Sequence, residues 1–156
     1  MDDRTPAGDA LTDIVMRTFR LNGQFLAAAE TMARPAGLTA AWWQVLGAVL
    51  RGPLPVSGIA REMGLARQSV QRIADLLVDK GLAEYQPNPA HRRAKLLAPT
   101  EAGWAAIGRL REAQHAWANR VSAAVGEREL RAALTTMEKL VGALAEDAEE
   151  QDPTVG

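Results

Sequence analysis

The chain has 156 residues, of which 47% are apolar and 24% charged, and its formal net charge is −1. This is the composition of a globular protein with room for one domain and a sizeable core, and no run of apolar residues is long enough to cross a membrane. The absence of cysteine excludes disulfides, thiol redox switches and thiolate metal sites. The start of the chain is acidic and polar, unlike a secretory signal, so a cytoplasmic protein is predicted.

Positive charge gathers in the middle of the chain. The segment Arg51–Thr100 holds eight Lys or Arg and four Asp or Glu, a net charge of +4, so the remainder carries −5. A basic centre in an otherwise acidic protein is typical of a local surface for a polyanion such as DNA. An uneven but functionless surface charge explains the same numbers.

Two helices are predicted before this segment. Apolar residues recur at helical spacing over Leu11–Ala33, and Pro35-Ala36-Gly37 ends that helix. Thr39 is a good N-cap residue and starts a second helix, which reaches about Arg51. The residues Met1–Ala10 are expected to lie outside the helices.

The basic segment predicts two short helices followed by a hairpin. The helices are Val56–Met63 and Ala66–Lys80, with a turn at Gly64 where a left-handed backbone angle suits glycine. Leu82–Gln86 and Arg93–Ala98 are predicted as the two strands, because the residues between them are turn formers.

Two long helices complete the chain. Thr100 caps a helix over Glu101–Ala124, and a break at Val125-Gly126 separates it from a helix over Glu127–Ala148. The acidic residues from Glu149 to the end are expected to lie outside the helices. The predicted fold class is therefore mainly α with a small β-hairpin wing.

The helix Ala66–Lys80 has one apolar and one polar face. At helical spacing its first two turns present a set of polar side chains outward: Arg67, Gln68, Ser69, Gln71 and Arg72. Arg suits the O6 and N7 acceptors of guanine, Gln suits adenine, and Ser suits either, so this face is fit to read bases in the major groove. An ordinary amphipathic helix also needs a polar face, and that alternative stays open for the helix alone.

The predicted hairpin tip strengthens the DNA interpretation. It carries three certain positive charges, on Arg92, Arg93 and Lys95, on a narrow projecting loop. Such a tip can lay a guanidinium group into the neighbouring minor groove, where the negative potential is strong. A solvated basic turn is the simpler alternative.

From Leu11 to Leu144 the sequence resembles the MarR family of bacterial regulators, named for multiple antibiotic resistance. The matching stretches are Leu38–Leu46, Val56–Leu65, Ala66–Leu77, Lys80–Leu82 and Asn88–Gly103. The resemblance implies a single winged helix-turn-helix domain over residues 1–156. In it, residues 38–100 bind DNA and residues 11–34 and 101–148 form dimerisation helices.

The resemblance also implies what the parts do. A homodimer presents two recognition helices to double-stranded DNA, on a pseudopalindromic operator with half-sites about one turn (~34 Å) apart. Arg93 corresponds to the wing Arg that reaches the minor groove, but His91 stands where the family has an Asp that pairs with it. Ala66 stands where a Ser, Thr or Asp cap is preferred, a loss of roughly 1 kcal/mol.

Other kinds of site find little support. His91 and His115 are the only histidines and lie far apart, so no metal site, no cofactor and no enzymatic activity are predicted. Members of the resembled family often bind small aromatic or phenolic effectors, and Trp43 and His115 are candidates to line such a pocket; core packing is the alternative for the tryptophans. A ligand-responsive repressor is thus expected, and a helical protein–protein adaptor without DNA binding is the competing hypothesis.

Overall fold

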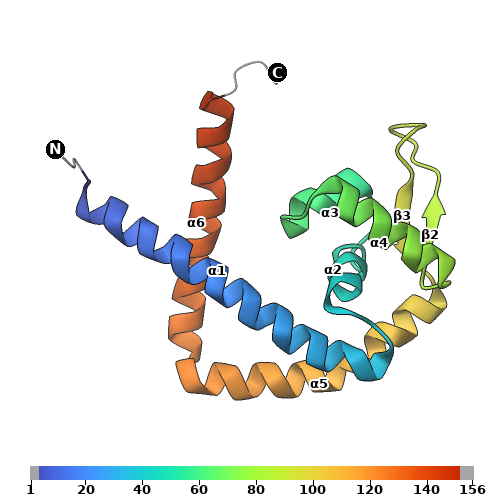
Figure 1. Ribbon diagram of the computed structural model, residues 1–156, viewed down its shortest axis with the longest axis horizontal. Helices are drawn as coiled ribbons and strands as arrows, with labels where there is room; N and C mark the ends of the chain where they lie inside the picture. Colours follow the sequence, from blue (N-terminus) through green and yellow to red (C-terminus); the bar gives the residue numbers. More distant parts are fainter. Residues whose placement is uncertain (1–3, 152–156) are drawn as a thin grey trace. The chain divides into compact units, whose positions relative to one another are not determined.

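The computed structural model describes residues 4–151. The chain divides into two compact units, Met1–Glu112 and Ala113–Gly156. Most of the described residues are helical, and a small antiparallel sheet belongs to the first unit. The predicted fold class is therefore confirmed (Figure 1), whereas the single domain over 1–156 with its parts at 38–100, 11–34 and 101–148 stays a prediction. Within residues 4–151, no helix has the length and apolar composition that crossing a bilayer requires.

Helix α1 runs from Pro6 to Ala33 and starts earlier than the apolar spacing indicates. The Thr5 hydroxyl oxygen accepts a hydrogen bond from the Gly8 N–H at 3.0 Å, and proline at the first helical position has no N–H that needs a partner. The prediction that Met1–Ala10 lies outside the helices is therefore wrong for residues 6–10, because this start signal is polar and has no apolar period. Residues 1–3 lie outside the described residues.

Helix α2, Ala40–Ala48, follows a short 3-10 turn at Arg34–Ala36. Thr39 is its N-cap as predicted, and the hydroxyl accepts a hydrogen bond from the Trp42 N–H at 3.1 Å. The Glu30 carboxylate of α1 accepts a second one from the Ala40 N–H at 2.7 Å. The start of α2 is thus held from α1 as well as by its own cap.

The end of α2 differs from the prediction. The helix ends at Ala48, and residues 49–51 form turns instead of continuing to Arg51. Gly52 follows with a φ of 157°, a backbone conformation that residues with a side chain rarely adopt. The change of direction brings the chain into a short strand before the next helix.

Helices α3, Val56–Met63, and α4, Arg67–Asp79, form the predicted pair. Gly64 lies between them with a φ of 63°, the left-handed conformation that glycine adopts without a Cβ clash. Ala66 is the N-cap of α4 and supplies no side-chain hydrogen bond. The inward face of α4 is apolar, and its fully or nearly buried residues are Val70, Ile73, Ala74 and Leu77.

The sheet has three strands, one more than the predicted hairpin. They are β1, Leu54–Pro55, β2, Ala83–Gln86, and β3, Leu96–Pro99, in the spatial order β1-β3-β2. Leu97 lies on the central strand, pairs with residues on both neighbours and is fully buried. Strand β1 ties the segment before α3 to the base of the wing.

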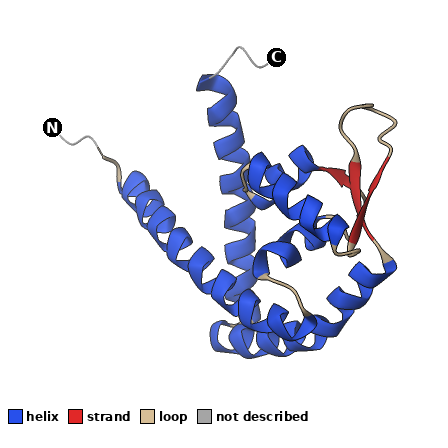
Figure 2. Cartoon of the chain, turned by 45° about the vertical axis from the view of Figure 1, so that its right-hand side comes forward, coloured by secondary structure: helices blue, strands red, loops and turns tan. Residues whose placement is uncertain are grey.

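The loop between β2 and β3 is the wing tip, and Figures 1 and 2 show it extending beyond the strands. The predicted strand Arg93–Ala98 is wrong at its start, since β3 begins only at Leu96. In the loop, the Asn88 side-chain oxygen accepts a hydrogen bond from the Ala90 N–H at 3.0 Å, and turns continue to residue 94. Arg93 and its neighbours therefore lie in the loop, free of the strand pairing.

Helix α5, Glu101–Val125, starts in close contact with the end of α4. The Thr100 hydroxyl donates a hydrogen bond to the Gly81 carbonyl at 2.6 Å and accepts one from the Gly103 N–H at 3.2 Å. A Cβ at Gly103 would lie 2.0 Å from the Leu82 carbonyl oxygen. Only glycine permits this approach, which fixes the base of the wing against α5.

The core of the first unit joins the helices to the sheet. Its largest fully buried side chains include Leu46 of α2, Ile59 of α3, Leu77 of α4 and Leu97 of β3. Because α2, α3, α4 and β3 each contribute a buried residue, apolar burial holds α4 and the base of the wing in one arrangement. The outward face of α4 and the wing loop remain exposed beside each other.

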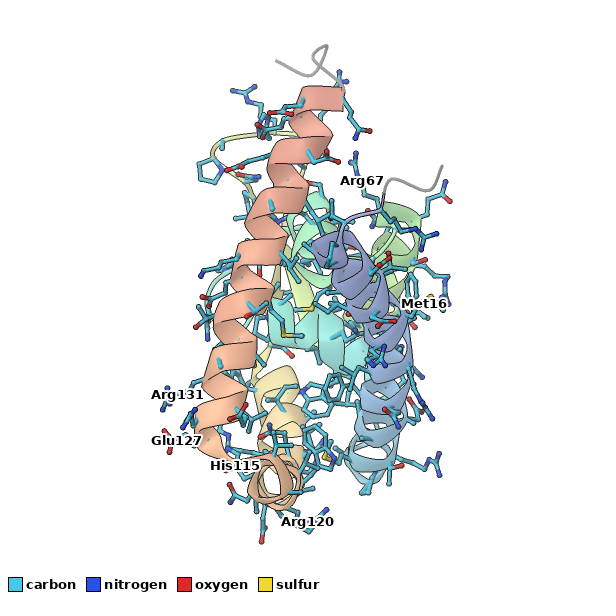
Figure 3. All side chains as sticks on the ribbon, turned by 90° about the vertical axis from the view of Figure 1, so that its left-hand side faces the viewer. Met16, Arg67, His115, Arg120, Glu127 and Arg131 are labelled. Atoms are coloured by element: carbon cyan, nitrogen blue, oxygen red, sulfur yellow. The ribbon has the colours of Figure 1, made fainter. Side chains whose placement is uncertain are left out.

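The second unit contains the end of α5 and helix α6, Glu127–Gln151, joined at Gly126. Arg131 and Glu127 form an ion pair of 2.8 Å in the first turns of α6, labelled in Figure 3. The prediction that Glu149 onward lies outside the helices is wrong up to Gln151, whose amide donates to the Asp147 carboxylate at 3.0 Å. Residues 152–156 lie outside the described residues.

Candidate nucleic-acid interface

A hollow of about 770 Å³ lies between the starts of α3 and α4 and the wing. Its lining includes five of the eight residues predicted to bind DNA, namely Arg67, Gln68, Gln71, Arg93 and Lys95. The other lining residues are Pro55, Val56, Ser57, Tyr85 and Ala94. The fold thus brings the predicted recognition helix and the predicted wing to one surface.

The charges of this hollow are positive. Arg67, Arg93 and Lys95 are exposed, and none of them forms an ion pair within residues 4–151. Figure 3 labels Arg67 on the first turn of α4. Three cations with no counter-ion among the described residues make the hollow attractive to an anion.

The remaining predicted residues lie around this hollow. Arg72 lines a neighbouring hollow of about 680 Å³ on the outward face of α4, together with Gln68, Gln71, Asp75, Leu76 and Asp79. Arg92 and Lys95 line a third, of about 380 Å³, beside strand β2 and the wing loop. Ser69 is half-buried and lines none of the three.

A hydrogen-bonded cluster joins α4 to strand β2. The Tyr85 hydroxyl donates to the Asp75 carboxylate oxygen Oδ1 at 2.5 Å. The Gln71 side-chain nitrogen Nε2 donates to that same oxygen and to the Tyr85 hydroxyl, both at 3.0 Å. The three residues come from one face of the helix and one strand, so they connect the recognition helix to the wing.

The cluster changes the acidity of its tyrosine. The pKa of Tyr85 is raised from 10.0 to about 12, mainly by partial burial and also by the hydrogen bond to Asp75 and the negative charge of that carboxylate. The hydrogen bond from Gln71 acts in the opposite direction. Tyr85 is therefore a neutral donor at every physiological pH.

Within the described residues there is no group of three or more His, Asp or Glu side chains that would hold a metal ion. The interface is lined instead by cations, amides and hydroxyls. Its chemistry is that of anion binding and hydrogen-bond recognition.

A profile of the MarR family matches residues 36–94, from the 3-10 turn before α2 through α4 into the wing. An uncharacterised protein of Mycobacterium tuberculosis is 36% identical over 136 residues, which cover 87% of this chain and 95% of the relative. The chain belongs to the MarR family. An uncharacterised protein of Mycobacterium bovis matches with the same identity and coverage.

Solved MarR structures have the same fold. A MarR family transcription regulator matches with a TM-score of 0.72 and 26% identity, over 91% of this chain and 95% of that one. CouR of Rhodococcus jostii, solved with p-coumaroyl-CoA, gives 0.64 and 27% over 85% and 92%. MosR of Mycobacterium tuberculosis, solved in complex with DNA, gives 0.67 at 23% over 83% and 96%, a likeness of fold.

MarR proteins are DNA-binding transcription regulators, so the predicted family and regulatory class are confirmed. Membership likewise confirms that the chain is a regulator and not an enzyme. The individual residues of the interface, and the effector pocket, stay predictions.

The two residues predicted to line an effector pocket lie in different units. Trp43 is half-buried on α2, where it packs against the core, and His115 is exposed on the part of α5 that belongs to the second unit. A shared MarR effector site for them is a proposal. His91, the wing residue that departs from the family pattern, is exposed in the loop.

Ser57, Asp75 and Tyr85 contribute to this MarR surface, and their roles were not predicted from the sequence. Ser57 lies at the start of α3 and lines the hollow between α3, α4 and the wing. The only signal for it in the sequence is the start of a helix just after Pro55. Asp75 on the outward face of α4 accepts a hydrogen bond from the Tyr85 hydroxyl of β2. No pattern in the sequence signals that pairing, because it depends on how β2 lies against α4.

Proposed function

We propose that this MarR protein binds a specific, pseudopalindromic DNA operator as a homodimer, through α4 and the wing. The observation that carries the proposal is the hollow of about 770 Å³ between them. With α4 in a major groove and the wing in the adjacent minor groove, one sugar–phosphate backbone passes between the two. Arg67 and Lys95 line the path of that backbone and would neutralise its phosphates, and Arg93 adds its positive charge beside them.

Base reading is assigned to the outward face of α4. Gln68, Gln71 and Arg72 are exposed there, with the lengths and donors that reach base edges. Ser69 is half-buried on the flank of the helix, which favours a phosphate or a single base contact near its start. These residues supply sequence preference, whereas the cations of the hollow supply most of the affinity.

The wing is assigned to the minor groove. Arg93 lies in the loop between β2 and β3, and Arg92 and Lys95 lie beside it. A guanidinium there is attracted most strongly by the narrow grooves of A·T-rich DNA. Because His91 replaces the family Asp, no carboxylate at that position holds Arg93, and its direction is set by DNA contact itself.

Dimerisation is assigned to α1, α5 and α6, each of which exposes large apolar side chains. On α1 they include Leu11, Ile14, Val15, Met16, Phe19 and Phe25, and on α6 Leu130, Leu134, Met137, Val141 and Leu144. Rows of exposed large apolar side chains on long helices are characteristic of a surface that a partner chain covers. A second copy of the chain would place two recognition helices about 34 Å apart on DNA.

We propose further that a small aromatic or phenolic effector controls this binding, and that the protein is a repressor. CouR, a relative in fold, was solved with p-coumaroyl-CoA, which carries a phenolic acyl group. Trp43 and His115 are the residues we assign to the effector, one for stacking and one for hydrogen bonding. With no cysteine in the chain, a ligand rather than thiol oxidation must shift the balance between DNA-binding and non-binding states.

The DNA interface is tested by the salt dependence of binding. Affinity of the full chain for labelled duplex DNA is measured over a salt series for wild type, Arg93→Ala and Arg128→Ala. Loss of Arg93 is expected to make the slope of log affinity against log salt shallower by roughly 0.9, the value of one phosphate contact. Arg128 is the control, since its side chain on α6 is 96% exposed and its partner Glu129 is 4.0 Å away.

Equal slopes for Arg93→Ala and wild type would remove Arg93 from the interface. Absence of salt-dependent binding by wild type would contradict DNA binding altogether and favour the adaptor hypothesis.

A further inference from the structure

We propose that Asp75 and Tyr85 are positioning residues that fix the side-chain amide of Gln71, so that its oxygen reads a base amino group. The inference rests on the proposed DNA-binding function and deepens it, because it assigns a base-edge chemistry to one residue. The group that Gln71 recognises is then the N6 amino group of adenine or the N4 amino group of cytosine.

The orientation of the amide follows from the chemistry of its neighbour. A carboxylate only accepts hydrogen bonds, so the atom of Gln71 that faces Asp75 Oδ1 at 3.0 Å must be the nitrogen. The amide oxygen therefore faces away from Asp75. Within residues 4–151 that oxygen accepts no hydrogen bond, and it belongs to an exposed side chain on the outward face of α4.

Tyr85 reinforces this orientation. Its hydroxyl lies 2.5 Å from Asp75 Oδ1 and 3.0 Å from Gln71 Nε2, so one N–H of the amide points between two neighbouring acceptors. The hydroxyl proton is committed to Asp75, which leaves the hydroxyl oxygen facing Gln71 as an acceptor. A flipped amide would set its oxygen against both of these oxygen atoms, so the flip is disfavoured.

A fixed amide is more selective than a free one. A mobile Gln rotates to present either its N–H or its oxygen and so accommodates donors and acceptors. With the amide orientation fixed by Asp75 and Tyr85, the Gln71 oxygen meets amino groups favourably and meets the O6 of guanine or the O4 of thymine with acceptor against acceptor. Specificity then comes partly from the rejected bases.

The test uses the full chain and the operator it selects from random duplex DNA. The position read by Gln71 is the one whose base preference falls roughly three- to tenfold in Gln71→Ala. At that position the base is replaced by an analogue that lacks only the exocyclic amino group. We expect the analogue to weaken wild-type binding and to have little further effect on Gln71→Ala, as a double-mutant cycle requires for a direct contact.

A 7-deaza purine at the same base pair provides the opposite probe, because it removes an acceptor instead of a donor. We expect its effect to be the same in wild type and Gln71→Ala. Coupling of Gln71 to the purine N7 and none to the amino group would show that the amide donates, and would overturn the proposal.

The positioning role is tested with Asp75→Asn and Tyr85→Phe. Both are expected to flatten the base preference at that one operator position and to leave the preferences at distant positions as they are. Asp79→Asn is the matched control: it removes the same charge from the same face of α4, where Asp79 makes no hydrogen bond with a described side chain. It is expected to raise affinity for all sequences alike and to leave the preference intact.

An unchanged preference in both Asp75→Asn and Tyr85→Phe would overturn the positioning role, and so would an equal loss in Asp79→Asn. The side-chain amide resonances of Gln71 give a readout that needs no DNA. They are expected to shift in both variants and not in Asp79→Asn, and their constancy would contradict the cluster itself. If wild type selects no DNA sequence, the proposed function fails. If wild type selects an operator but Gln71 shows no coupling to the amino group of a base, only this inference fails.

Discussion

Tyr85 is the side chain through which the wing strand makes its polar contact with the recognition helix. Its ring is half-buried against the core, while its hydroxyl meets Asp75 and Gln71 at the exposed edge. Apolar packing fixes where β2 lies, but it does not fix the direction of an exposed glutamine amide. The three hydrogen bonds do that, at the point where the protein is proposed to meet bases.

The titration of Tyr85 tests this contact at the level of one residue. It is the only tyrosine in the chain, so the phenolate absorbance of the whole protein reports it alone. Its pKa is raised to about 12, first by burial and then by Asp75. We expect a midpoint near that value in the folded protein and a lower one in Asp75→Asn, with circular dichroism recorded alongside to confirm folding.

The raised pKa of Tyr85 also makes the stability of the protein depend on pH. Folding favours the protonated phenol, so the contribution of Tyr85 is complete below pH 10 and is lost as the pH rises through about 12. Tyr85→Phe has no phenol to ionise, so the loss of unfolding free energy that Tyr85 causes as the pH rises through about 12 should be absent from this variant. A midpoint near pH 10 in folded wild-type protein would contradict the cluster.

At the scale of elements, the junction between β3 and α5 depends on one glycine. A Cβ at Gly103 would lie 2.0 Å from the Leu82 carbonyl oxygen, so Gly103→Ala must displace the base of the wing. We expect a loss of about 2–3 kcal/mol in unfolding free energy, typical of overpacking, measured by urea denaturation.

Gly108→Ala is the control for this substitution. Gly108 lies on the same helix, and nothing lies within 4 Å of the position of its Cβ. Alanine there should stabilise the protein by up to about 1 kcal/mol, because glycine is a poor helix former. Equal effects of the two substitutions would show that the close approach at Gly103 is not real.

Local signals explain which elements the sequence predicts well. The helices on either side of Gly64 are recovered within a residue at each end, because the glycine and the apolar periods agree. Strand β1 is missed because two residues, one of them Pro55, show no alternation and are stabilised only by pairing with β3. The wing strand is predicted too early for a related reason, since loop and strand differ there only in long-range hydrogen bonds.

The candidate site shows the same division. The cations and amides of α4 and the wing are readable from helical spacing and from the hairpin, and the fold gathers five of them at one hollow. The roles of Asp75 and Tyr85 are not readable, because residues ten positions apart meet only once β2 is laid along α4. Sequence thus indicates which groups are available, and tertiary structure decides which of them are held.

At the scale of the whole molecule, the proposed dimer rests on the exposed apolar side chains of α1 and α6. Val141 is 70% exposed on α6, so a charge there costs the isolated chain little. We expect wild type to sediment as a dimer and Val141→Glu to sediment as a monomer with an unchanged helical circular dichroism spectrum. Operator affinity should fall with dimerisation, because one half-site gives only part of the binding energy.

Lys139→Glu is the control, since it places the same side chain at an exposed position of α6 that is already polar. It should leave the dimer intact apart from a modest effect of charge. A monomeric wild type, or a Val141→Glu variant that remains dimeric, would contradict this assignment of α6.

Selection of bound duplexes from a random DNA pool by the full-length protein tests the DNA-binding proposal most directly. We predict enrichment of an imperfect palindrome whose half-sites lie about one helical turn apart, ~34 Å, as a two-fold dimer with one recognition helix per half-site requires. No enriched sequence, or a single asymmetric site bound by a monomer, would contradict it.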